Sequence, residues 1–318
     1  MKMAVWFLKD LQKNFLGMNV LKKLILESRV MINIIANLFI NGLLLGGLFA
    51  LTAFGLSILA GIMKVINIAH GDFAILAAYL ALTIMRFLRI DPLLCILIVA
   101  PIMFGVGYLF QRFTINRVLP KGANQPVLVT FALSIVIQNL LLLVFTADAR
   151  SLTPNYLLMS INIFSLSPSP RYLLGFVSAL IVFSAIFLFF KKTYLGKAMR
   201  AVPFDPEAAK MIGIKSEVVY NYAAGLALLV VGIAGVLLGM AFTFYPDTGP
   251  TYVLLSFGVV VLGGLGSLKG SLVGGFIIGE ALVFGGYLFG SCFQLMFCYL
   301  VILVILYLRP QGIFGGKL

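Results

Sequence analysis

Long apolar runs alternate with short polar connections along almost the whole chain. About 20 consecutive apolar residues are enough to cross a bilayer as a helix. Nine stretches approach this length, and they lie at residues 33–62, 70–88, 92–111, 125–147, 171–190, 218–244, 250–267, 271–289 and 291–308. No series of short alternating segments of the kind found in membrane β-barrels is evident, and helices satisfy their own backbone hydrogen bonds in lipid. The pattern predicts an all-α, polytopic transmembrane helical bundle of about eight to nine spans, including broken or re-entrant segments.

Composition supports this interpretation. Of the 318 residues, 62% are hydrophobic and only 10% are charged, whereas soluble domains are about 45–50% apolar. The net charge of +13 comes from cations that lie mostly in the short connections, which is the positive-inside pattern of a membrane protein and not a nucleic-acid-binding patch. Three cysteines (Cys95, Cys292 and Cys298) lie inside apolar runs. We interpret them as small buried hydrophobic residues and expect neither a disulfide framework nor a metal site.

The longest polar passage in the second half of the chain, residues 191–217, carries six basic residues between two apolar runs. Such loops stay on the cytoplasmic side of a membrane. Asp205 can cap a helix, Pro206 suits its first position and Gly213 can end it. These signals predict a helix of about two turns outside the membrane, too short to be stable alone. We therefore expect it to dock on a separate protein that supplies energy, although an ordinary surface helix has the same pattern.

Counting spans from this loop gives an orientation. Four spans follow it, so we expect the C-terminus in the cytoplasm; counting backwards places loop 112–124 inside and loop 148–170 outside. The count then puts the basic N-terminus outside, against the charge rule. Either residues 33–69 are not one simple span, or the N-terminal helix lies on the outer face. We expect the first, a broken or re-entrant element, because polar and glycine residues interrupt the run; they are Asn37, Asn41, Gly42, Gly46, Gly47 and Gly55.

The chain therefore divides into an amphipathic basic N-terminal segment, residues 1–31, and a transmembrane domain, residues 32–318. In the first segment, apolar residues at near-helical spacing alternate with lysines, which suits a helix lying in the head-group layer. A disordered basic tail is the alternative. The loop at 148–170 is the longest on the outer side, and it is either a receptor for a delivery protein or a lid over the span ends.

Two groups of polar residues lie within or beside apolar runs. Asn67, His70, Gly71 and Asp72 occupy a junction between two runs, and they form either a gate in a polar pathway or a capped helix start at the membrane surface. Glu280 stands alone in its run. It contacts substrate, relays a proton, or satisfies a neighbouring helix. With Asn41, these residues are the candidates for the pathway or gate. A single histidine does not make a metal site.

Glycines cluster near the end of the chain. Their density favours close helix packing or a tight turn between two spans; the residues concerned are Gly263, Gly264, Gly266, Gly270 and Gly274. The phosphate-loop pattern GxxxxGK[ST] is missing here and throughout the chain. We find no arrangement of a nucleophile and a base either, so the sequence predicts a transport subunit with no catalytic residues and no ATPase motif of its own.

Four stretches in this order resemble one family, the LIV-type permeases. They are NGLLLGGLFALTAFGLSILAGIMKVINIAHGDFAILAAYLA (41–81), GKAMRAVPFDPEAAKMIGI (196–214), VVVLGGLGSLKGSLVGGFIIGEAL (259–282) and LRPQGIFG (308–315). LIV-type permeases are membrane subunits of ABC importers for branched-chain amino acids. The resemblance covers residues 40–315. The segment from Glu207 to Gly213 matches the EAA motif, whose helix docks on the ATPase, but the later Ile-x-Leu-Pro portion is absent and Ala223 stands where its Ile would fall.

The resemblance implies a permease subunit of an ATP-driven importer for branched-chain, hydrophobic amino acids, with solute crossing at the interface with a second LIV-type permease. It implies a multi-pass protein of a bacterial or archaeal cytoplasmic (inner) membrane. Two ATPases and an extracytoplasmic binding protein would be its partners, together with the lipid bilayer and no nucleic acid; ATP and Mg would be used by the ATPases, and this chain would bind no cofactor. The residues carried over for coupling are Arg200, Asp205, Pro206, Glu207, Ala208, Ala209 and Gly213. Two alternatives stay open: a permease for urea or short amides, and a proton-coupled secondary transporter using His70, Asp72 and Glu280.

Overall fold

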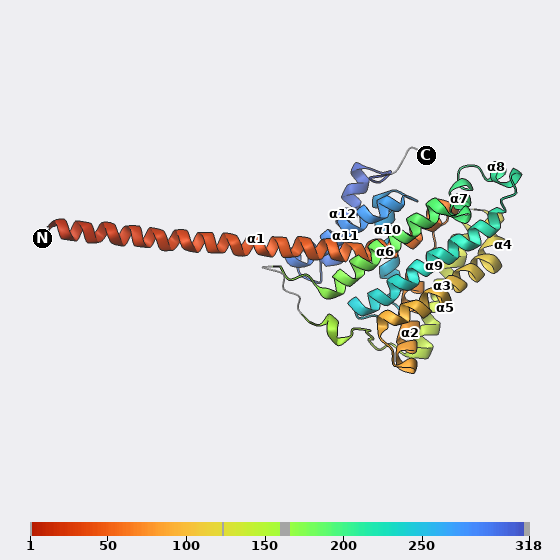
Figure 1. Cartoon of the computed structure of the whole chain (residues 1–318), viewed down its shortest axis with the longest axis horizontal. Coiled ribbons are helices and arrows are strands. Elements are labelled where there is room, and N and C mark those ends of the chain that lie inside the picture. Colours follow the sequence, from red (N-terminus) through yellow and green to blue (C-terminus); the bar gives the residue numbers. More distant parts are fainter. Residues whose placement is uncertain (1, 123, 160–165, 315–318) are drawn as a thin grey trace.

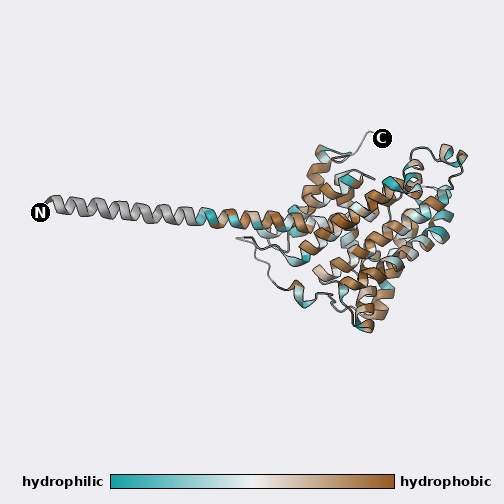
Figure 2. Ribbon diagram, in the orientation of Figure 1, coloured by the Kyte–Doolittle hydropathy of each residue, from teal (hydrophilic) through white to brown (hydrophobic). Residues whose placement is uncertain are grey.

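The structure, a computed structural model, describes residues 2–122, 124–159 and 166–314, with side chains from residue 27 onward except that of Pro206. Within these ranges the chain is helical apart from its connections. The only β-type contact among the described residues is an isolated antiparallel bridge between Arg150 and Phe244. The prediction of an all-α bundle is therefore confirmed. Figure 2 shows apolar residues throughout the bundle and more polar ones toward its two ends.

Seven of the described helices are long and apolar enough to cross a membrane. They are α1 (Lys2–Met63, apolar from Glu27), α2 (His70–Leu88), α3 (Pro92–Phe110, continuing helically to Lys121), α5 (Gln125–Phe145), α6 (Pro170–Lys192), α9 (Ser216–Ala241) and α11 (Leu268–Phe289). Two shorter apolar helices, α10 (Gly249–Gly263) and α12 (Gln294–Leu308), fall on the remaining predicted runs. The predicted runs thus each contain one helix. Between α3 and α5 lie a π-turn (Gln111–Ile115), α4 (Asn116–Val118) and a 3-10 turn (Leu119–Lys121); η3 (Asn155–Leu157), α7 (Tyr194–Ala201) and α8 (Pro206–Met211) lie in the longer loops.

Helix α1 is the central element of the bundle. It packs against α6, α9, α10 and α11, and its residues 44–59 are buried. Residues 33–69 are not one simple span, as expected, but the break does not fall at the polar and glycine residues, because α1 continues without interruption to Met63. Its glycines serve close packing instead: a side chain at Gly46 would meet the backbone of Gly275 and Phe276 in α11, and one at Gly47 would meet Phe176 in α6. The chain breaks later, at residues 64–69.

The bundle has two faces, which we name by their loops: the coupling face carries residues 191–217, called the coupling loop, and the outer-loop face carries residues 148–170. On the coupling face, the end of α1 lies beside α7 and the turn at Gly266, and the Ile313 amide donates to the Leu262 carbonyl at 2.8 Å. On the outer-loop face, Asn41 of α1 donates to the carbonyl of Ser167, and Tyr156 donates to Asp91 at 2.9 Å. The C-terminal helix thus ends on the same face as α7, and loops 112–124 and 148–170 lie on the faces that the span count requires.

The N-terminal part of α1 projects from the outer-loop face, as Figure 1 shows. At 1.5 Å per residue, the 62 residues of α1 extend about 90 Å, three times the hydrocarbon thickness of a bilayer. The expected boundary between residues 31 and 32 has no counterpart in the backbone, which is one helix there. The side chains that carry the predicted amphipathic pattern, Leu8 to Leu24, lie outside the described residues. Of the two explanations for the N-terminal orientation, the arrangement agrees with the outer-face helix.

Candidate transport and coupling sites

Two helices begin inside the bundle, not at its surface. His70, the first residue of α2, places its Nε2 2.8 Å from the carbonyl oxygen of Thr52. Thr52 lies eleven residues before the end of α1, so residues 64–69 return about 16 Å into the bundle before α2 starts. A side chain at Gly71 would meet the carbonyl of Gly249, the first residue of α10. We call this meeting point, formed by residues 67–72 with Gln138 and Gly249, the interior junction.

Asp72 is the charged residue of the interior junction, and it is 1% exposed. Its Oδ1 accepts a hydrogen bond from Gln138 Nε2 at 2.9 Å, while Oδ2 has no hydrogen-bond partner among the described residues. Any side chain at Gly249 would collide with the Asp72 carboxylate. Asp72 therefore lies in the first turn of α2 and directly beside the first turn of α10. The partial positive charges of both helix N-termini stabilise an ionised carboxylate at this position.

His70 is also 1% exposed and is held by the backbone of α1. A carbonyl oxygen only accepts, so the Nε2 facing Thr52 carries the proton. In a neutral imidazole, Nδ1 is then an acceptor, and it has no partner among the described residues. The Thr52 hydroxyl accepts in turn from Ser256 of α10 at 3.1 Å. The junction thus ties α1, α2 and α10 through polar groups and leaves an acceptor on His70 and one on Asp72 unused.

Helix α5 is attached to the junction by a polar stripe. Thr130, Ser134 and Gln138 are spaced four residues apart and so share one helix face. The Thr130 hydroxyl accepts from the Ile68 amide at 3.2 Å, and Gln138 donates to both Asp72 and Ser134. The sequence analysis missed these residues. Polar residues at a helical period inside an apolar span are the signal that could have found them.

The second group of pathway candidates lies elsewhere. Glu280 is twelve residues into α11, about 18 Å from its start, and a side chain at Gly42 of α1 would overlap its carboxylate. Neither carboxylate oxygen has a hydrogen-bond partner among the described residues. Asn41, the neighbour of Gly42, instead binds the outer loop, because its Oδ1 accepts from the Ser169 amide at 2.8 Å. The structure therefore divides the candidates into the interior junction and a Glu280–Gly42 contact, and Gly42 is a further residue that sequence reasoning did not assign to the site.

The predicted packing glycines bring α10 and α11 together. At Gly263 and Gly270 an added side chain would meet the backbone of the other residue, and at Gly274 it would meet Val259. Gly264 and Gly266 have positive φ angles of 95° and 78°, which form the turn between the helices. Gly266 also lies against Gly61 at the end of α1. Close helix approach and a tight turn, which were alternatives for this run, occur side by side.

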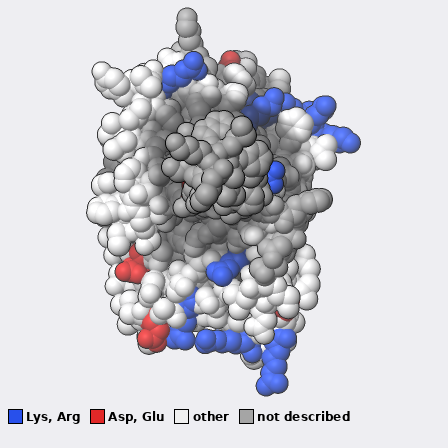
Figure 3. Space-filling model, turned by 90° about the vertical axis from the view of Figure 1, so that its left-hand side faces the viewer, with Lys and Arg blue, Asp and Glu red and all other residues white. Residues whose placement is uncertain are grey.

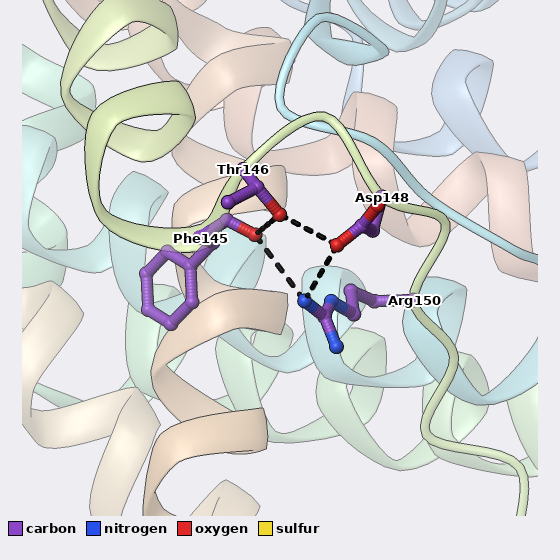
Figure 4. A network of polar contacts seen from close by, with 4 residues as sticks. All are labelled: Phe145, Thr146, Asp148 and Arg150. Atoms are coloured by element: carbon purple, nitrogen blue, oxygen red, sulfur yellow. Dashed lines mark hydrogen bonds and ion pairs between the residues drawn. The ribbon is translucent and has the colours of Figure 1, made fainter.

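The outer loop is hydrogen-bonded to the end of α9 and to the link between α9 and α10. Arg150 forms an ion pair with Asp148 at 3.2 Å and donates to the Phe145 carbonyl (Figure 4). Its backbone pairs with Phe244, and the Leu152 amide donates to Gly239 at 2.8 Å. Nearby, burial and the hydrogen bond to Asp91 raise the pKa of Tyr156. Figure 3, which looks at this face along α1, shows cations mainly at its upper and lower edges and acids at the lower left.

The coupling loop contains the predicted helix, α8. Asp205 caps it by accepting from the amides of Glu207 and Ala208 at 3.1 and 2.9 Å. Gly213 ends it with a φ of 85°, and the Ile214 amide donates to Ala209 at 3.0 Å. The side chain of Pro206 lies outside the described residues. The cap and the stop that the sequence indicated are both present.

Not every residue carried over for coupling is exposed. Ala209 is 3% exposed and packs inward, so it is not available to a partner. The exposed apolar side chains are Phe204, Met211 and Ile212, at 92%, 86% and 74%. Glu207, Lys210 and Arg200 are exposed around them. An exposed patch of large apolar groups rimmed by charge is typical of a protein–protein contact.

A bundle that spans the membrane several times, with two helices that begin inside it and a capped helix outside it, is the architecture of a membrane transport protein. The family model described as "Branched-chain amino acid transport system / permease component" matches residues 38–306. The chain belongs to this family, which confirms the resemblance found in its sequence.

Several curated relatives cover nearly the same length. The high-affinity branched-chain amino acid transport system permease protein BraD of Pseudomonas aeruginosa is 29% identical over 87% of this chain and 94% of its own. The high-affinity branched-chain amino acid transport system permease protein LivH of Salmonella typhimurium is 25% identical over 86% of this chain and 94% of its own. A probable branched-chain amino acid transport permease protein LivH of Methanocaldococcus jannaschii is 28% identical over 86% of this chain and 91% of its own. A chain of the solved structure of PsaBC from Streptococcus pneumoniae in complex with Fab aligns with a TM-score of 0.48, at 14% identity, over 86% of this chain and 92% of that chain.

Proposed function

We propose that this permease is the membrane-spanning subunit of an ATP-driven ABC importer for branched-chain amino acids. The observation that carries the proposal is α8: a helix capped at Asp205, ended at Gly213 and presenting Phe204, Met211 and Ile212 to the exterior of the bundle. It lies in the most basic loop of the chain, and the positive-inside rule supports a cytoplasmic coupling face and C-terminus. The names of the curated relatives support the substrate class.

In this proposal, two cytoplasmic ATPases bind the α8 helices of two permease subunits and move them as rigid levers. An extracytoplasmic binding protein delivers solute to the outer-loop face, and ATP and Mg are bound by the ATPases. The interior junction lies where such a movement would be transmitted, because α1, α2, α5 and α10 meet there. The N-termini of α2 and α10 at the junction also suit the carboxylate of an amino acid when the junction opens.

The test is uptake by the purified system. We expect proteoliposomes with internal ATP, the co-purifying subunits and the binding protein to take up labelled leucine, with competition by isoleucine and valine but not by urea or acetamide. The control omits ATP. Uptake by this chain alone under a pH gradient would contradict the proposal and establish a secondary transporter, whereas ATP-driven urea uptake would keep the transporter class and overturn the substrate.

A further inference from the structure

A groove of about 570 Å³ opens on the coupling face over the last turns of α1. Ile58 and Ile62 of α1 form its floor, and Phe190 of α6 and Met199 of α7 form one wall. All four are at most 7% exposed, whereas two cations at the rim, Lys64 and Arg200, are exposed. The groove is separate from the interior junction. It adjoins the proposed docking patch, because Arg200 and Phe204 line it, but no residue of α8 itself (Pro206–Met211) does.

The groove exists because two helices diverge. Helices α6 and α11 both pack along α1, and nearer the outer-loop face the rings of Phe176 and Phe276 close the gap between them, with centroids 6.0 Å apart. Toward the coupling face, α6 ends at Lys192 and α11 begins at Leu268. Between the aromatic pair and the coupling face, the space between the two helices is therefore left open.

The two rim cations have no partner of their own. Lys64 follows the last residue of α1 with a φ of 55°, and Arg200 lies in the last turn of α7. Neither side chain makes a hydrogen bond or ion pair with another residue in the described part of the chain. No acidic residue lines the groove. Its chemistry therefore suits a ligand with an anionic head and an apolar body, and not a zwitterion, whose ammonium group would find no carboxylate.

We propose that the groove binds an anionic phospholipid of the adjacent leaflet. An acyl chain lies between α6 and α11 against α1, and the phosphate lies between Lys64 and Arg200. Basic pockets between membrane helices are suited to anionic head groups, and each cation contributes to the attraction. Because Met199 and Arg200 belong to α7, the lipid links the coupling loop to the end of α1. Lipid binding of this kind requires only that the bundle spans a bilayer, and it does not depend on the proposed substrate.

A fluorescent reporter in the groove tests this proposal directly. The chain has one tryptophan, Trp6. Because Leu268 lines the groove, the pair W6F and L268W leaves a single tryptophan in its lining. The full chain is reconstituted in nanodiscs with increasing fractions of phosphatidylglycerol or phosphatidylcholine brominated on the acyl chain. We expect phosphatidylglycerol to reach half-maximal quenching at a mole fraction about 5- to 30-fold lower, as expected for two cations.

Charge removal supplies the control. In the same background, K64Q with R200Q should abolish the preference for phosphatidylglycerol, whereas K121Q, which removes an exposed cation outside the groove, should retain it. Equal quenching by the two lipids in the parent protein would overturn the proposal. The absence of quenching by either lipid would also overturn it. In that case, quenching by acrylamide would indicate a water-filled vestibule, and no quenching by lipid or acrylamide would indicate a protein subunit in the groove. Quenching reports lipid in the groove whether or not the protein transports leucine. Leucine uptake, measured on the same samples, therefore tests the proposed function independently.

Discussion

The interior junction and the coupling helix α8 are built in opposite ways. At the junction, Asp72 accepts a hydrogen bond from α5 and lies against the backbone of α10. Glycines let the helices approach closely there. Helix α8 is held by a local cap and a local stop, and its large apolar side chains are exposed. The junction is specified by contacts within this chain. Helix α8 is shaped by local contacts in this chain, and in the proposed function a partner covers its exposed side.

This difference predicts how the two regions respond to substitution. Interiors are close-packed, so a change at the junction acts on the fold and through it on transport. Surface changes rarely alter stability by more than about 0.5 kcal/mol, so a change on α8 acts on a partner while the bundle stays intact. Stability and partner binding should therefore separate, and the following substitutions test this from the largest effect on stability to the smallest.

The largest loss is expected for G71A. The new methyl group would collide with the Gly249 carbonyl and lie 2.7 Å from the Val253 amide nitrogen, and neither backbone can move without separating α2 from α10. We expect a loss near or above the upper end of the 1–3 kcal/mol typical of overpacking, measured as a fall in the thermal midpoint followed by fluorescence size exclusion. The matched control is G105A in α3, where nothing lies within 4 Å and a helix is stabilised by the change. Equal midpoints for the two variants would contradict the close approach.

A smaller loss is expected for Q138L. It removes the donor to Asp72 and leaves a buried carboxylate with less compensation, which costs about 1–3 kcal/mol. Because Gln138 links α5 to the junction, we also expect slower uptake at unchanged expression. The control is N139L, whose side chain is exposed and donates only within α5, to Ile135. If N139L lowers the thermal midpoint as much as Q138L does, the link between α5 and Asp72 does not hold the helix in place.

The sequence predicted the number and position of the apolar helices because each one satisfies its own backbone in lipid and needs a fixed length. It also predicted the cap at Asp205 and the stop at Gly213, which are local. It was wrong about where the first span breaks. Glycines within α1 resemble helix breakers, but they lie against α6 and α11, and a contact with another helix cannot be read from the run itself.

Contacts between distant parts of the chain also explain why the candidate sites were only partly predicted. Asp72 and Glu280 were found because a carboxylate in an apolar run is conspicuous, but their partners, Gln138 and Gly42, lie 66 and 238 positions away in the chain. Ala209 was included among the coupling residues through the family resemblance, but its side chain is buried. Its direction is set by packing on the bundle, and that packing depends on how the loop folds back.

At the coupling helix, D205A should act only locally. Its carboxylate accepts from two amides at the start of α8, and loss of such a cap costs about 1 kcal/mol. We expect faster amide exchange at residues 207–212 with an unchanged thermal midpoint for the bundle. The variant D205N keeps a capping side chain and should restore slow exchange. A fall in the midpoint with D205A would mean that α8 is part of the core and would remove the contrast between the regions.

The smallest effect on stability and the largest on assembly are expected for I212D. Ile212 is 74% exposed and follows the last residue of α8, so a carboxylate there remains hydrated in the isolated chain and changes stability by no more than about 0.5 kcal/mol. In an apolar contact the same carboxylate must lose its water, which costs several kcal/mol. The expected result is a normal thermal midpoint, loss of the ATPases from a mild-detergent pull-down and loss of ATP-driven uptake. K210Q, which changes charge on the same helix but leaves the apolar patch, should keep most of the binding. Retention of the ATPases by I212D would show that they dock elsewhere, and the coupling helix would then have to be explained as part of the bundle, like the junction.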